Sequence, residues 1–331
     1  MATLRDPATW PERTFYAMGC QMSARLAIEP HAGTTPLAQV ETFFHAAESA
    51  LSRFRPDSEL AFVNAHPDQW LSLSPLLWDI VSVALEMAEQ TGGLFDPTLL
   101  FALESAGYRH SFEQMPANMN DTTAAEAASR SSHVPWRGRG YRQLRRRHAR
   151  HQLLLPAGLK LDLGGIAKGY IAQAAVDHLR SWGPALVDAG GDLVAGDAPP
   201  GYPGWPVAVA APSPLVQDDR MDVAQLWLVN AALATSGIDY RQWQAQGRTM
   251  HHIIDPRTGE PAATDLLSAT VLASTAAQAE GWAKAAIILG SANAVEALEQ
   301  RGYAALFVRR DGELLTTPLA QQWPTGQDIP K

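Results

Sequence analysis

The stretch of sequence that says most about this chain is Leu161-Asp162-Leu163-Gly164-Gly165-Ile166-Ala167-Lys168-Gly169-Tyr170. It places an acid, a pair of glycines and a lysine on what the pattern predicts to be a turn from a strand into a helix. Glycine lets a backbone approach a ligand closely, and the free N–H groups at a helix start attract phosphate. The stretch therefore predicts a site for a phosphate-bearing ligand.

A second segment, His251-His252-Ile253-Ile254-Asp255-Pro256, brings two imidazoles and a carboxylate close together in the sequence. Histidine has an ordinary pKa of about 6.5, which suits proton transfer at neutral pH. In a strand, His252 and Asp255 would point to opposite faces, so they need not act as a pair. We expect His252 and Asp255 to be the acid–base groups and assign no role to His251. The alternative for His252 is a packed histidine that is hydrogen-bonded to the backbone.

The composition excludes several classes of protein. The chain has 331 residues, of which 46% are hydrophobic and 18% charged, as in a globular protein. A formal charge of −8 and a pI of about 5.7 argue against general nucleic-acid binding. Cys20 is the single cysteine, the N-terminus lacks the pattern of a signal peptide, and no apolar run is long enough to span a bilayer. We therefore expect a cytoplasmic protein without a membrane span.

Helical and strand patterns alternate along the chain without a strict strand–helix–strand rhythm, which predicts an α+β or mixed α/β fold. Apolar residues at helical spacing predict helices over 37–54, 76–90, 169–182 and 276–289, and Ser291 is expected to cap a last helix that runs to 300. Strands are expected as a pair within 14–28 and over 186–188, 207–211, 226–229, 267–274, 304–308 and 313–316. We expect one interlocked domain over 1–331, with its motifs within 14–317, and surface excursions at 111–150 and 198–206.

Several short motifs occur in an order that is typical of one family. They are Ala17-Met18-Gly19-Cys20, Ser52-Arg53-Phe54-Arg55-Pro56-Asp57-Ser58-Glu59-Leu60 with Asn64, Gly93-Leu94-Phe95-Asp96-Pro97-Thr98, Asp162 to Gly169, Ala189-Gly190-Gly191-Asp192, Thr235-Ser236-Gly237, and His252-Ile253-Ile254-Asp255-Pro256 with Thr258-Gly259. In this order they make the chain resemble the FAD:protein FMN transferase (ApbE-like flavin transferase) family.

The resemblance implies a single ApbE-like (T-fold-like) domain with a twisted, largely antiparallel sheet core and flanking helices. Family members bind FAD and transfer its FMN half to a Thr or Ser hydroxyl of a target protein, releasing AMP, usually with the help of Mg²⁺. The residues that would line the FAD site by match are Met18, Phe54, Leu94, Phe95, Asp96, Asp162, Lys168 and His252. Many members carry Tyr in place of Phe54, so here stacking is kept and a hydroxyl is lost.

Some of these residues also have a purely structural explanation. Phe54 and Phe95 could be ordinary core aromatics, and Asp96 could merely initiate a turn. Asp162 is harder to explain in that way, because an unpaired buried carboxylate is costly. Lys168 at a helix start opposes the helix dipole, so we expect an anion beside it, either Asp162 or a flavin phosphate.

By match, the family's metal positions are Gly165, Glu280 and Lys284, and the chain departs from the family at the last two. Members usually carry Asp where this chain has Glu280, and Thr where it has Lys284. An ammonium group would repel Mg²⁺, which prefers oxygen ligands in octahedral geometry. Three interpretations stay open. Lys284 replaces the charge of the metal while it pairs with Glu280; the chain binds flavin but transfers poorly; or the helix is shifted and Lys284 extends into solvent.

The main functional prediction is a transferase that moves FMN from FAD to a Thr or Ser hydroxyl of an acceptor protein. FAD is the donor substrate, and the need for Mg²⁺ is left open by Glu280 and Lys284. One alternative is an FAD-binding protein of the same fold with weak or lost transferase activity. The other is an FAD pyrophosphatase that yields FMN and AMP. The chain lacks an acceptor motif of the Asp-Gly-x-x-Gly-Ala-Thr type, which argues against its being a flavin-carrying substrate.

An arginine-rich run extends from Arg137 to Arg150. It could bind nucleic acid or an acidic partner, but the negative charge of the whole chain favours a solvated loop and strand edge. If the run has a function, we expect it to dock an acidic target protein near the flavin.

Overall fold

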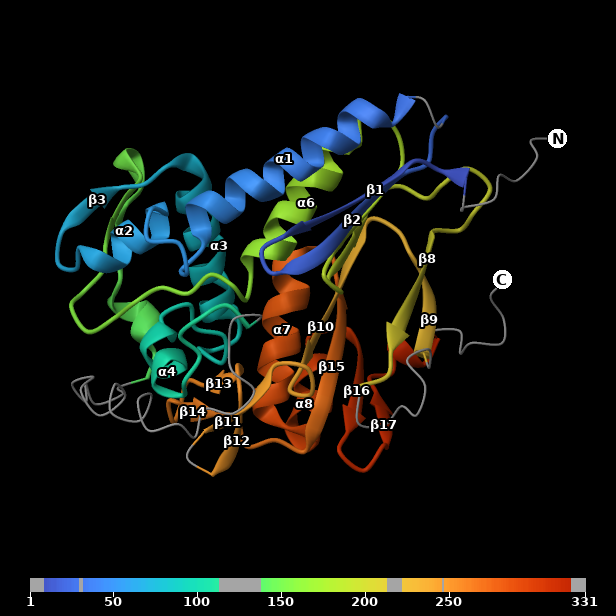
Figure 1. Ribbon diagram of the computed structural model, residues 1–331. Coiled ribbons are helices and arrows are strands. Elements are labelled where there is room, and N and C mark those ends of the chain that lie inside the picture. Colours follow the sequence, from blue (N-terminus) through green and yellow to red (C-terminus); the bar gives the residue numbers. More distant parts are fainter. Residues whose placement is uncertain (1–8, 30–31, 113–137, 213–221, 246, 323–331) are drawn as a thin grey trace.

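A twisted antiparallel sheet forms the centre of the computed structural model, which describes residues 9–29, 32–112, 138–212, 222–245 and 247–322 (Figure 1). The sheet has 8 strands in the order β1-β2-β6-β7-β10-β15-β16-β17, and every neighbouring pair is antiparallel. The strands are β1 (Glu12–Ala17), β2 (Cys20–Leu26), β6 (Ala185–Ala189), β7 (Leu193–Ala195), β10 (Ala231–Gly237), β15 (Leu266–Ala273), β16 (Ala304–Arg309) and β17 (Leu314–Thr316). The expected mixed fold with a largely antiparallel sheet is confirmed.

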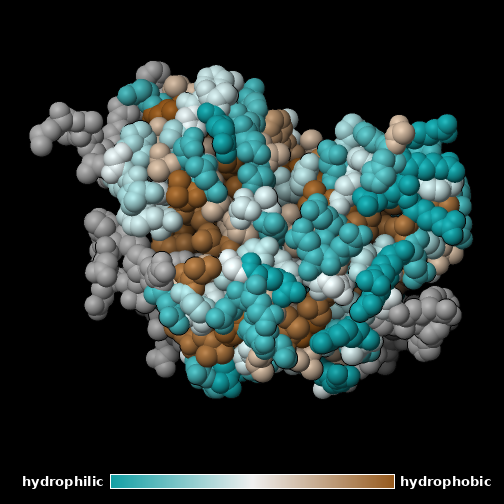
Figure 2. Space-filling view, turned by 180° about the vertical axis from the view of Figure 1, so that it is seen from behind, coloured by the Kyte–Doolittle hydropathy of each residue, from teal (hydrophilic) through white to brown (hydrophobic). Residues whose placement is uncertain are grey.

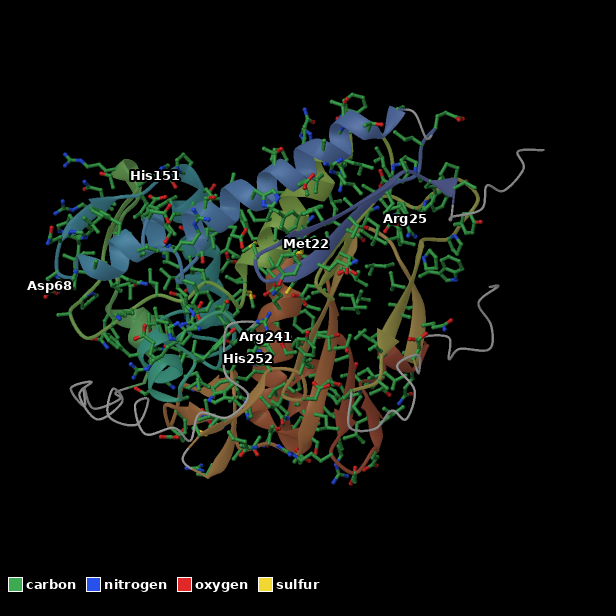
Figure 3. The ribbon with its side chains drawn as sticks, in the orientation of Figure 1. Met22, Arg25, Asp68, His151, Arg241 and His252 are labelled. Atoms are coloured by element: carbon green, nitrogen blue, oxygen red, sulfur yellow. The ribbon has the colours of Figure 1, made fainter. Side chains whose placement is uncertain are left out.

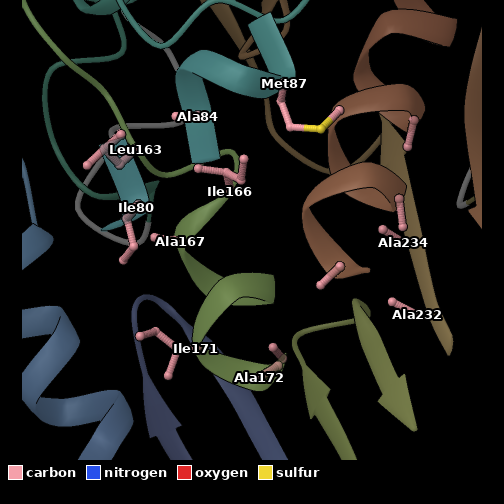
Figure 4. Close-up of a cluster of buried hydrophobic side chains, with 14 of the residues drawn as sticks. Ile80, Ala84, Met87, Leu163, Ile166, Ala167, Ile171, Ala172, Ala232 and Ala234 are labelled. Carbon is pink, nitrogen blue, oxygen red and sulfur yellow. The ribbon is translucent and has the colours of Figure 1, made fainter. Parts of the chain in front are cut away.

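Helices cover one face of this sheet and enclose the main hydrophobic core. They are α1 (Thr34–Leu51), α3 (Pro75–Gln90), α6 (Ala167–Leu179), α7 (Ala276–Leu289) and α8 (Ser291–Glu299). Figure 4 shows buried apolar side chains of α3, α6 and β10 in one cluster, for example Met87, Ile171 and Ala234. Alanines and glycines dominate the middle of α7, so this helix packs closely on both α6 and the sheet.

The opposite face of the sheet is covered by a pair of strands, β8 (Trp205–Ala210) and β9 (Asp222–Leu228). Trp205 is fully buried there and packs edge-on against Trp10, with ring centroids 5.2 Å apart. Strand β15 is therefore buried on both faces, which explains its nearly continuous apolar sequence.

Smaller elements gather at the ends of α3 and α7, at the left of Figure 1. They are α2 (Glu59–Ala65), β3 (Trp70–Ser72), α4 (Leu100–Ser105), η4 (Gly140–Gln143), β4 (Arg145–Arg147), η5 (His148–Arg150), β5 (Gln152–Leu154), β11 (Gln242–Ala245), β12 (Arg248–His251), β13 (Ile254–Asp255) and β14 (Glu260–Pro261), and η7 (Ala320–Gln322) follows β17. In the part of the chain that the structure describes, no helix is both long and apolar enough to cross a membrane.

Local sequence signals explain where several helices begin. The hydroxyl of Ser74 accepts a hydrogen bond from Leu77 N at 3.2 Å at the start of α3, and Pro75 follows it. Thr275 caps α7 in the same way, through Gln278 N at 3.3 Å. The expectation for Ser291 is wrong, because Gly290 is the cap of α8 and the side chain of Ser291 instead hydrogen-bonds Asp265.

Two further expectations are corrected by the tertiary structure. Residues 161–163 belong to no strand, although an isolated bridge joins Lys160 to Leu99. His252 lies between β12 and β13 rather than within a strand. Of the expected surface excursion, 113–137 lies outside the described residues; 138–150 forms η4, β4 and η5, where most side chains are exposed and Tyr141 is buried.

Helices α6 and α7 approach each other most closely at Gly169, in the first turn of α6. A Cβ atom at this position would lie 2.4 Å from Glu280 Oε1 and 2.9 Å from the Cβ of Ala276. The Gly169 N–H donates to Glu280 Oε1 at 2.7 Å, so a side chain of α7 supplies the cap that α6 lacks in its own sequence.

We predict that Gly169→Ala destabilises the protein although alanine is the better helix former. The gain in helix propensity is about 1 kcal/mol, whereas overpacking a filled core costs about 1–3 kcal/mol. Urea unfolding should therefore give a lower free energy of unfolding for the variant. Asp177→Ala, on the exposed side of the same helix, serves as the control and should change it by less than about 0.5 kcal/mol. A stabilised Gly169→Ala variant would contradict the close approach of α6 and α7.

Candidate functional site

A cavity of about 990 Å³ opens between the sheet, the start of α6 and the smaller elements. Its size is that of a site for a small organic ligand or cofactor. Segments far apart in the sequence line it, from the turn after β1 to the C-terminal half of α7. The predicted site residues that line it are Met18, Phe54, Leu94, Phe95, Asp96, Asp162, Gly165, Lys168, His252 and Lys284. Glu280 and Asp255 are not among the lining residues.

Lys168 has an anionic side chain beside it, and this is Asp192 rather than Asp162, which the sequence offered as an alternative to a flavin phosphate. Its Nζ lies 3.3 Å from Asp192 Oδ2, and both side chains are largely buried. Burial alone would lower the pKa of Lys168, but the negative charges of Asp192 and Glu280 outweigh it and raise the pKa above that of an ordinary lysine. Lys168 is therefore a permanent cation on the cavity wall.

Asp192 is positioned by the tight turn between β6 and β7. Gly190 and Gly191 both adopt positive φ angles there, of 73° and 97°, which glycine tolerates best. Gly191 N donates to Asp188 Oδ1 at 2.7 Å and closes the turn. A Cβ at Gly190 would lie 2.7 Å from the Cβ of Cys20, so this turn also needs glycine for close approach to β2.

Asp162 pairs with Arg53, a residue to which we assigned no role from the sequence. The Nε of Arg53 lies 3.5 Å from Asp162 Oδ2, and its Nη1 donates to the carbonyl oxygen of Tyr108 at 3.0 Å. The guanidinium lies 4.2 Å from the ring centre of Phe54 and 4.6 Å from that of Tyr108. Its Nη2 is buried and has no hydrogen-bond partner among the described residues.

The sequence carried one signal for Arg53. An arginine directly before an aromatic residue, in a motif that lines a ligand site, can stack on that residue and still present N–H donors. The second ring, Tyr108, is distant in the sequence, and only the tertiary structure brings it to Arg53. Phe54 is 39% exposed and lines the cavity, so it is not an ordinary core aromatic.

Met18 and Phe95 both form part of the cavity wall. Met18 has a φ of 52°, and its N–H donates to Glu48 Oε1 at 2.9 Å, which holds the turn between β1 and β2. Phe95 is only 6% exposed and belongs to the main core as well as to the cavity lining. Its structural explanation and its predicted role in the site are therefore compatible.

Asp96 forms the turn that its sequence context suggested. Its Oδ1 accepts hydrogen bonds from Thr98 N at 2.9 Å and from Thr98 Oγ1 at 2.6 Å. Burial raises the pKa of this carboxyl above its ordinary value, against the opposing effect of these hydrogen bonds. Asp96 therefore shapes the loop and also presents a polar edge to the cavity.

His252 presents a neutral imidazole to the cavity. Its Nδ1 is buried and lacks a hydrogen-bond partner among the residues that the structure describes. Burial, followed by the positive charges of Arg241 and Lys284, holds the pKa of His252 well below its ordinary value. Figure 3 shows Arg241 and His252 next to each other near the centre of the molecule. Such a histidine can accept a proton at neutral pH.

Asp255 occupies a different environment. Its carboxylate accepts hydrogen bonds from Arg257 N at 2.8 Å, Nε at 2.9 Å and Nη2 at 2.7 Å. Such a bidentate pair closes the turn between β13 and β14. The geometry thus gives Asp255 a structural role, contrary to our expectation of an acid–base group.

The predicted metal positions do come together, but a lysine side chain fills the space between them. Lys284 Nζ lies 3.4 Å from Glu280 Oε2, and a Cβ at Gly165 would lie 2.8 Å from Lys284 Cε. Glu280 is completely buried, and its Oε1 accepts from Gly169 N. Lys284 lines the cavity and is 21% exposed, so the interpretation in which it extends into solvent is wrong.

These residues do not fit a Mg²⁺ ion. One carboxylate oxygen of Glu280 is bound to a backbone N–H and the other faces an ammonium group. Mg²⁺ requires near-octahedral oxygen ligands, and a cation beside Lys284 would be repelled. Within the described ranges, no group of three or more His, Cys, Asp or Glu side chains could hold a metal ion either.

His251 faces away from this cavity, as we expected when we assigned it no role. It lines a second cavity of about 750 Å³ together with Arg248 and Arg310, and its Nε2 lies 3.1 Å from the carbonyl oxygen of Ala262. Burial lowers the pKa of His251, so this imidazole too is neutral at neutral pH.

The described part of the arginine-rich run lies on the surface. Arg145, Arg147 and Arg150 are exposed, and the guanidinium of Arg147 lies 3.9 Å from the ring centre of Trp70. Seen from behind, hydrophilic side chains cover much of the molecule, and apolar side chains appear in separate patches (Figure 2). Arg137 lies outside the described residues.

Comparison with known proteins shows to which family the chain belongs. Residues 18–307 match the ApbE family. The chain belongs to the ApbE family. The family that the motif order suggested is thereby confirmed.

Proteins named FAD:protein FMN transferase are among the relatives of this chain. The protein from Salmonella typhimurium is 30% identical over 297 residues, which cover 87% of this chain and 80% of that protein. The protein from Treponema pallidum is 32% identical over 309 residues, with the same shares covered.

Solved ApbE structures have the same fold. The ApbE protein of Thermotoga maritima gives a TM-score of 0.79 at 25% identity, covering 94% of this chain and 98% of that one. The apo form of the flavinyl transferase ApbE of Pseudomonas stutzeri gives 0.77 at 24% identity, covering 97% and 98%.

The lowered pKa of His252 predicts how stability depends on pH. The unfolded chain protonates its histidines at about pH 6.5, whereas folded His252 resists protonation, so the unfolded state binds more protons. The free energy of unfolding should therefore fall as the pH drops below about 6.5. His251 contributes in the same direction.

Urea unfolding of the ligand-free protein at pH 7.5 and at pH 5.5 measures this effect. The loss of stability between the two pH values should be smaller in His252→Gln than in the wild type. His148→Gln, at an exposed histidine, is the control and should leave the loss unchanged. Equal losses in wild type and His252→Gln would show that His252 is protonated without penalty in the folded state.

Proposed function

We propose that this chain is an FAD:protein FMN transferase, which moves FMN from FAD to a Thr or Ser hydroxyl of another protein. The observation that carries the proposal is the neutral His252 on the wall of a cavity that also presents the cations Lys168 and Lys284. Phosphoryl transfer needs a proton acceptor for the attacking hydroxyl and positive charge for the phosphate oxygens. The names of the relatives support the same activity.

Arg53 and its aromatic neighbours suit a flat, conjugated ligand. The guanidinium already lies against the rings of Phe54 and Tyr108, so an edge rich in acceptors would find an unused donor in its buried Nη2. We propose that this corner of the cavity binds a ring system of FAD. Met18, Leu94 and Phe95 add apolar surface, and Asp96 and Asp162 border it.

The turn at the start of α6 suits the phosphates. Gly164 and Gly165 bring backbone to the cavity without side chains, and Lys168 follows in the first helical turn. Lys168 already has Asp192 as its partner, so we propose that it shares its ammonium protons between that carboxylate and the ligand. Of the two anions that the sequence suggested, the flavin phosphate is kept in this proposal, whereas Asp162 pairs with Arg53 and Asp192 lies beside Lys168 in its place.

The proposed reaction forms one phosphorus–oxygen bond and breaks another. The hydroxyl oxygen of the acceptor attacks the phosphorus atom of the FMN half, and a new phosphorus–oxygen ester bond forms. The pyrophosphate bond breaks, and AMP leaves with the bridging oxygen. The hydroxyl proton passes to the neutral imidazole of His252, which later releases it to solvent or to the leaving group. Asp255 takes no part, because its carboxylate is committed to Arg257.

Several finer expectations remain proposals. We propose an acceptor protein with a Thr or Ser flavinylation motif as the partner, no role for nucleic acid, a single domain over 1–331, and a cytoplasmic location. The single domain is supported by a cavity whose walls come from both halves of the chain. The sequence left the need for a resident Mg²⁺ open, and we propose that none is needed, because both carboxylate oxygens of Glu280 are already paired.

We predict that His252→Gln lowers the rate of FMN transfer by about 100-fold or more while FAD still binds. Intact mass of a Thr-containing acceptor domain after incubation with FAD measures the transfer, and quenching of flavin fluorescence measures binding. Asp255→Asn is the matched comparison, and per folded molecule it should transfer at close to the wild-type rate.

The same assay separates the alternatives. A pyrophosphatase would release FMN and AMP without an acceptor, and a carrier would bind FAD without either product. No FMN adduct from the wild type under any condition would overturn the proposed function. Unchanged transfer by His252→Gln would remove His252 from the mechanism.

A further inference from the structure

We infer that the ammonium group of Lys284 occupies the place of a divalent cation, and that this chain handles FAD without a resident metal ion. The inference rests on the proposed function and goes beyond it, because the relatives' names specify a reaction and no metal. It concerns the metal positions Gly165, Glu280 and Lys284, of which the last two depart from the family pattern.

The side chain of Lys284 lies in the space that an ion would need. Its Cε would be only 2.8 Å from a Cβ at Gly165, so the lysine stem packs directly on the backbone of that glycine. Its Nζ lies 3.4 Å from Glu280 Oε2. An ion bound between the backbone at Gly165 and the carboxylate of Glu280 would collide with this side chain and would meet its charge.

The pair is arranged asymmetrically with respect to the cavity. Glu280 is completely buried behind the start of α6, whereas the side chain of Lys284 is 21% exposed and lines the cavity. A ligand in the cavity therefore meets the ammonium group and is shielded from the carboxylate. Although the pair is neutral as a whole, it presents positive charge where phosphate oxygens would bind.

Glu280 is held so that it keeps the lysine in place. Its Oε1 accepts from Gly169 N at 2.7 Å, at the positive end of the dipole of α6, which leaves Oε2 for Lys284. Lysine and glutamate lie one turn apart on α7, in the order that favours an ion pair. An ammonium group carries three donors and needs no octahedral set of ligands, so it can follow the phosphates during the reaction.

Metal binding itself is the first test. Mn²⁺ serves as the probe, and electron paramagnetic resonance of free Mn²⁺ measures how much is bound, with and without FAD. The wild type should bind none in the cavity. Glu280→Asp/Lys284→Thr, which supplies a shorter carboxylate and a hydroxyl, should bind Mn²⁺ when FAD is present. One tightly bound Mn²⁺ per wild-type chain would overturn the inference.

FAD affinity is the second test and does not depend on transfer. In the wild type it should be the same in EDTA and in Mg²⁺. Removing the charge with Glu280→Gln/Lys284→Met should weaken FAD binding by about 10- to 100-fold, and Mg²⁺ should not restore it. This double change leaves no unpaired buried carboxylate, so it avoids the unfolding that Lys284→Met alone risks.

A matched pair elsewhere supplies the control. Lys160 Nζ lies 3.3 Å from Glu104 Oε2, and neither residue lines the cavity. Glu104→Gln/Lys160→Met should leave FAD affinity unchanged. Wild-type affinity in Glu280→Gln/Lys284→Met, or a loss of wild-type affinity in EDTA, would overturn the inference.

Transfer to the acceptor domain completes the experiment. The wild type should form the FMN adduct equally in EDTA and in Mg²⁺, whereas Glu280→Asp/Lys284→Thr should require Mg²⁺. If no protein forms an adduct, the proposed function fails, and the Mn²⁺ and FAD measurements still decide the role of Lys284. If the wild type does not bind FAD, both are overturned.

Discussion

The buried carboxylate of Glu280 is the group on which much of this structure depends. A charge without contact with water is costly unless other groups compensate it, and the penalty is several kcal/mol. Burial raises the pKa of Glu280 above its ordinary value, and partial compensation comes from the ammonium of Lys284, the more distant charge of Lys168 and the N–H of Gly169. These groups fix how α6 and α7 pack, because Gly169 cannot carry a side chain and still reach the carboxylate.

The cavity follows from the same arrangement. With α6 and α7 locked together, the glycine turn before α6 and the side chain of Lys284 face the same space. Two lysine–carboxylate pairs, Lys168 with Asp192 and Lys284 with Glu280, then present their cations to that space. Burial, followed by the positive charges of Arg241 and Lys284, keeps His252 neutral, so the proposed phosphate site and the proposed base share the charge of Lys284.

The sequence predicted the structure reliably where a feature depends only on residues that are close together in the chain. The helix expected over 276–289 is found there, because Thr275 caps it and Gly290 ends it within the sequence itself. Ion pairs between residues that are far apart in the sequence could not be predicted in this way. Lys168 clearly needed an anion, but Asp192 reaches it only because the β6–β7 turn lies beside α6. Asp255 resembled an acid–base group until the turn placed Arg257 against it.

By itself, the sequence determined the family, the mixed fold with its antiparallel sheet, and most of the residues that line the cavity. Motif order and apolar periodicity carry that information, because both are properties of the amino-acid sequence itself. Only the tertiary structure decided how each charge is paired. It decided that Arg53 lies against two aromatic rings, that Asp162 pairs with it, and that Lys284 points into the cavity rather than into solvent. Electrostatic partners depend on distances of a few ångströms between segments, and spacing along a chain does not specify such distances.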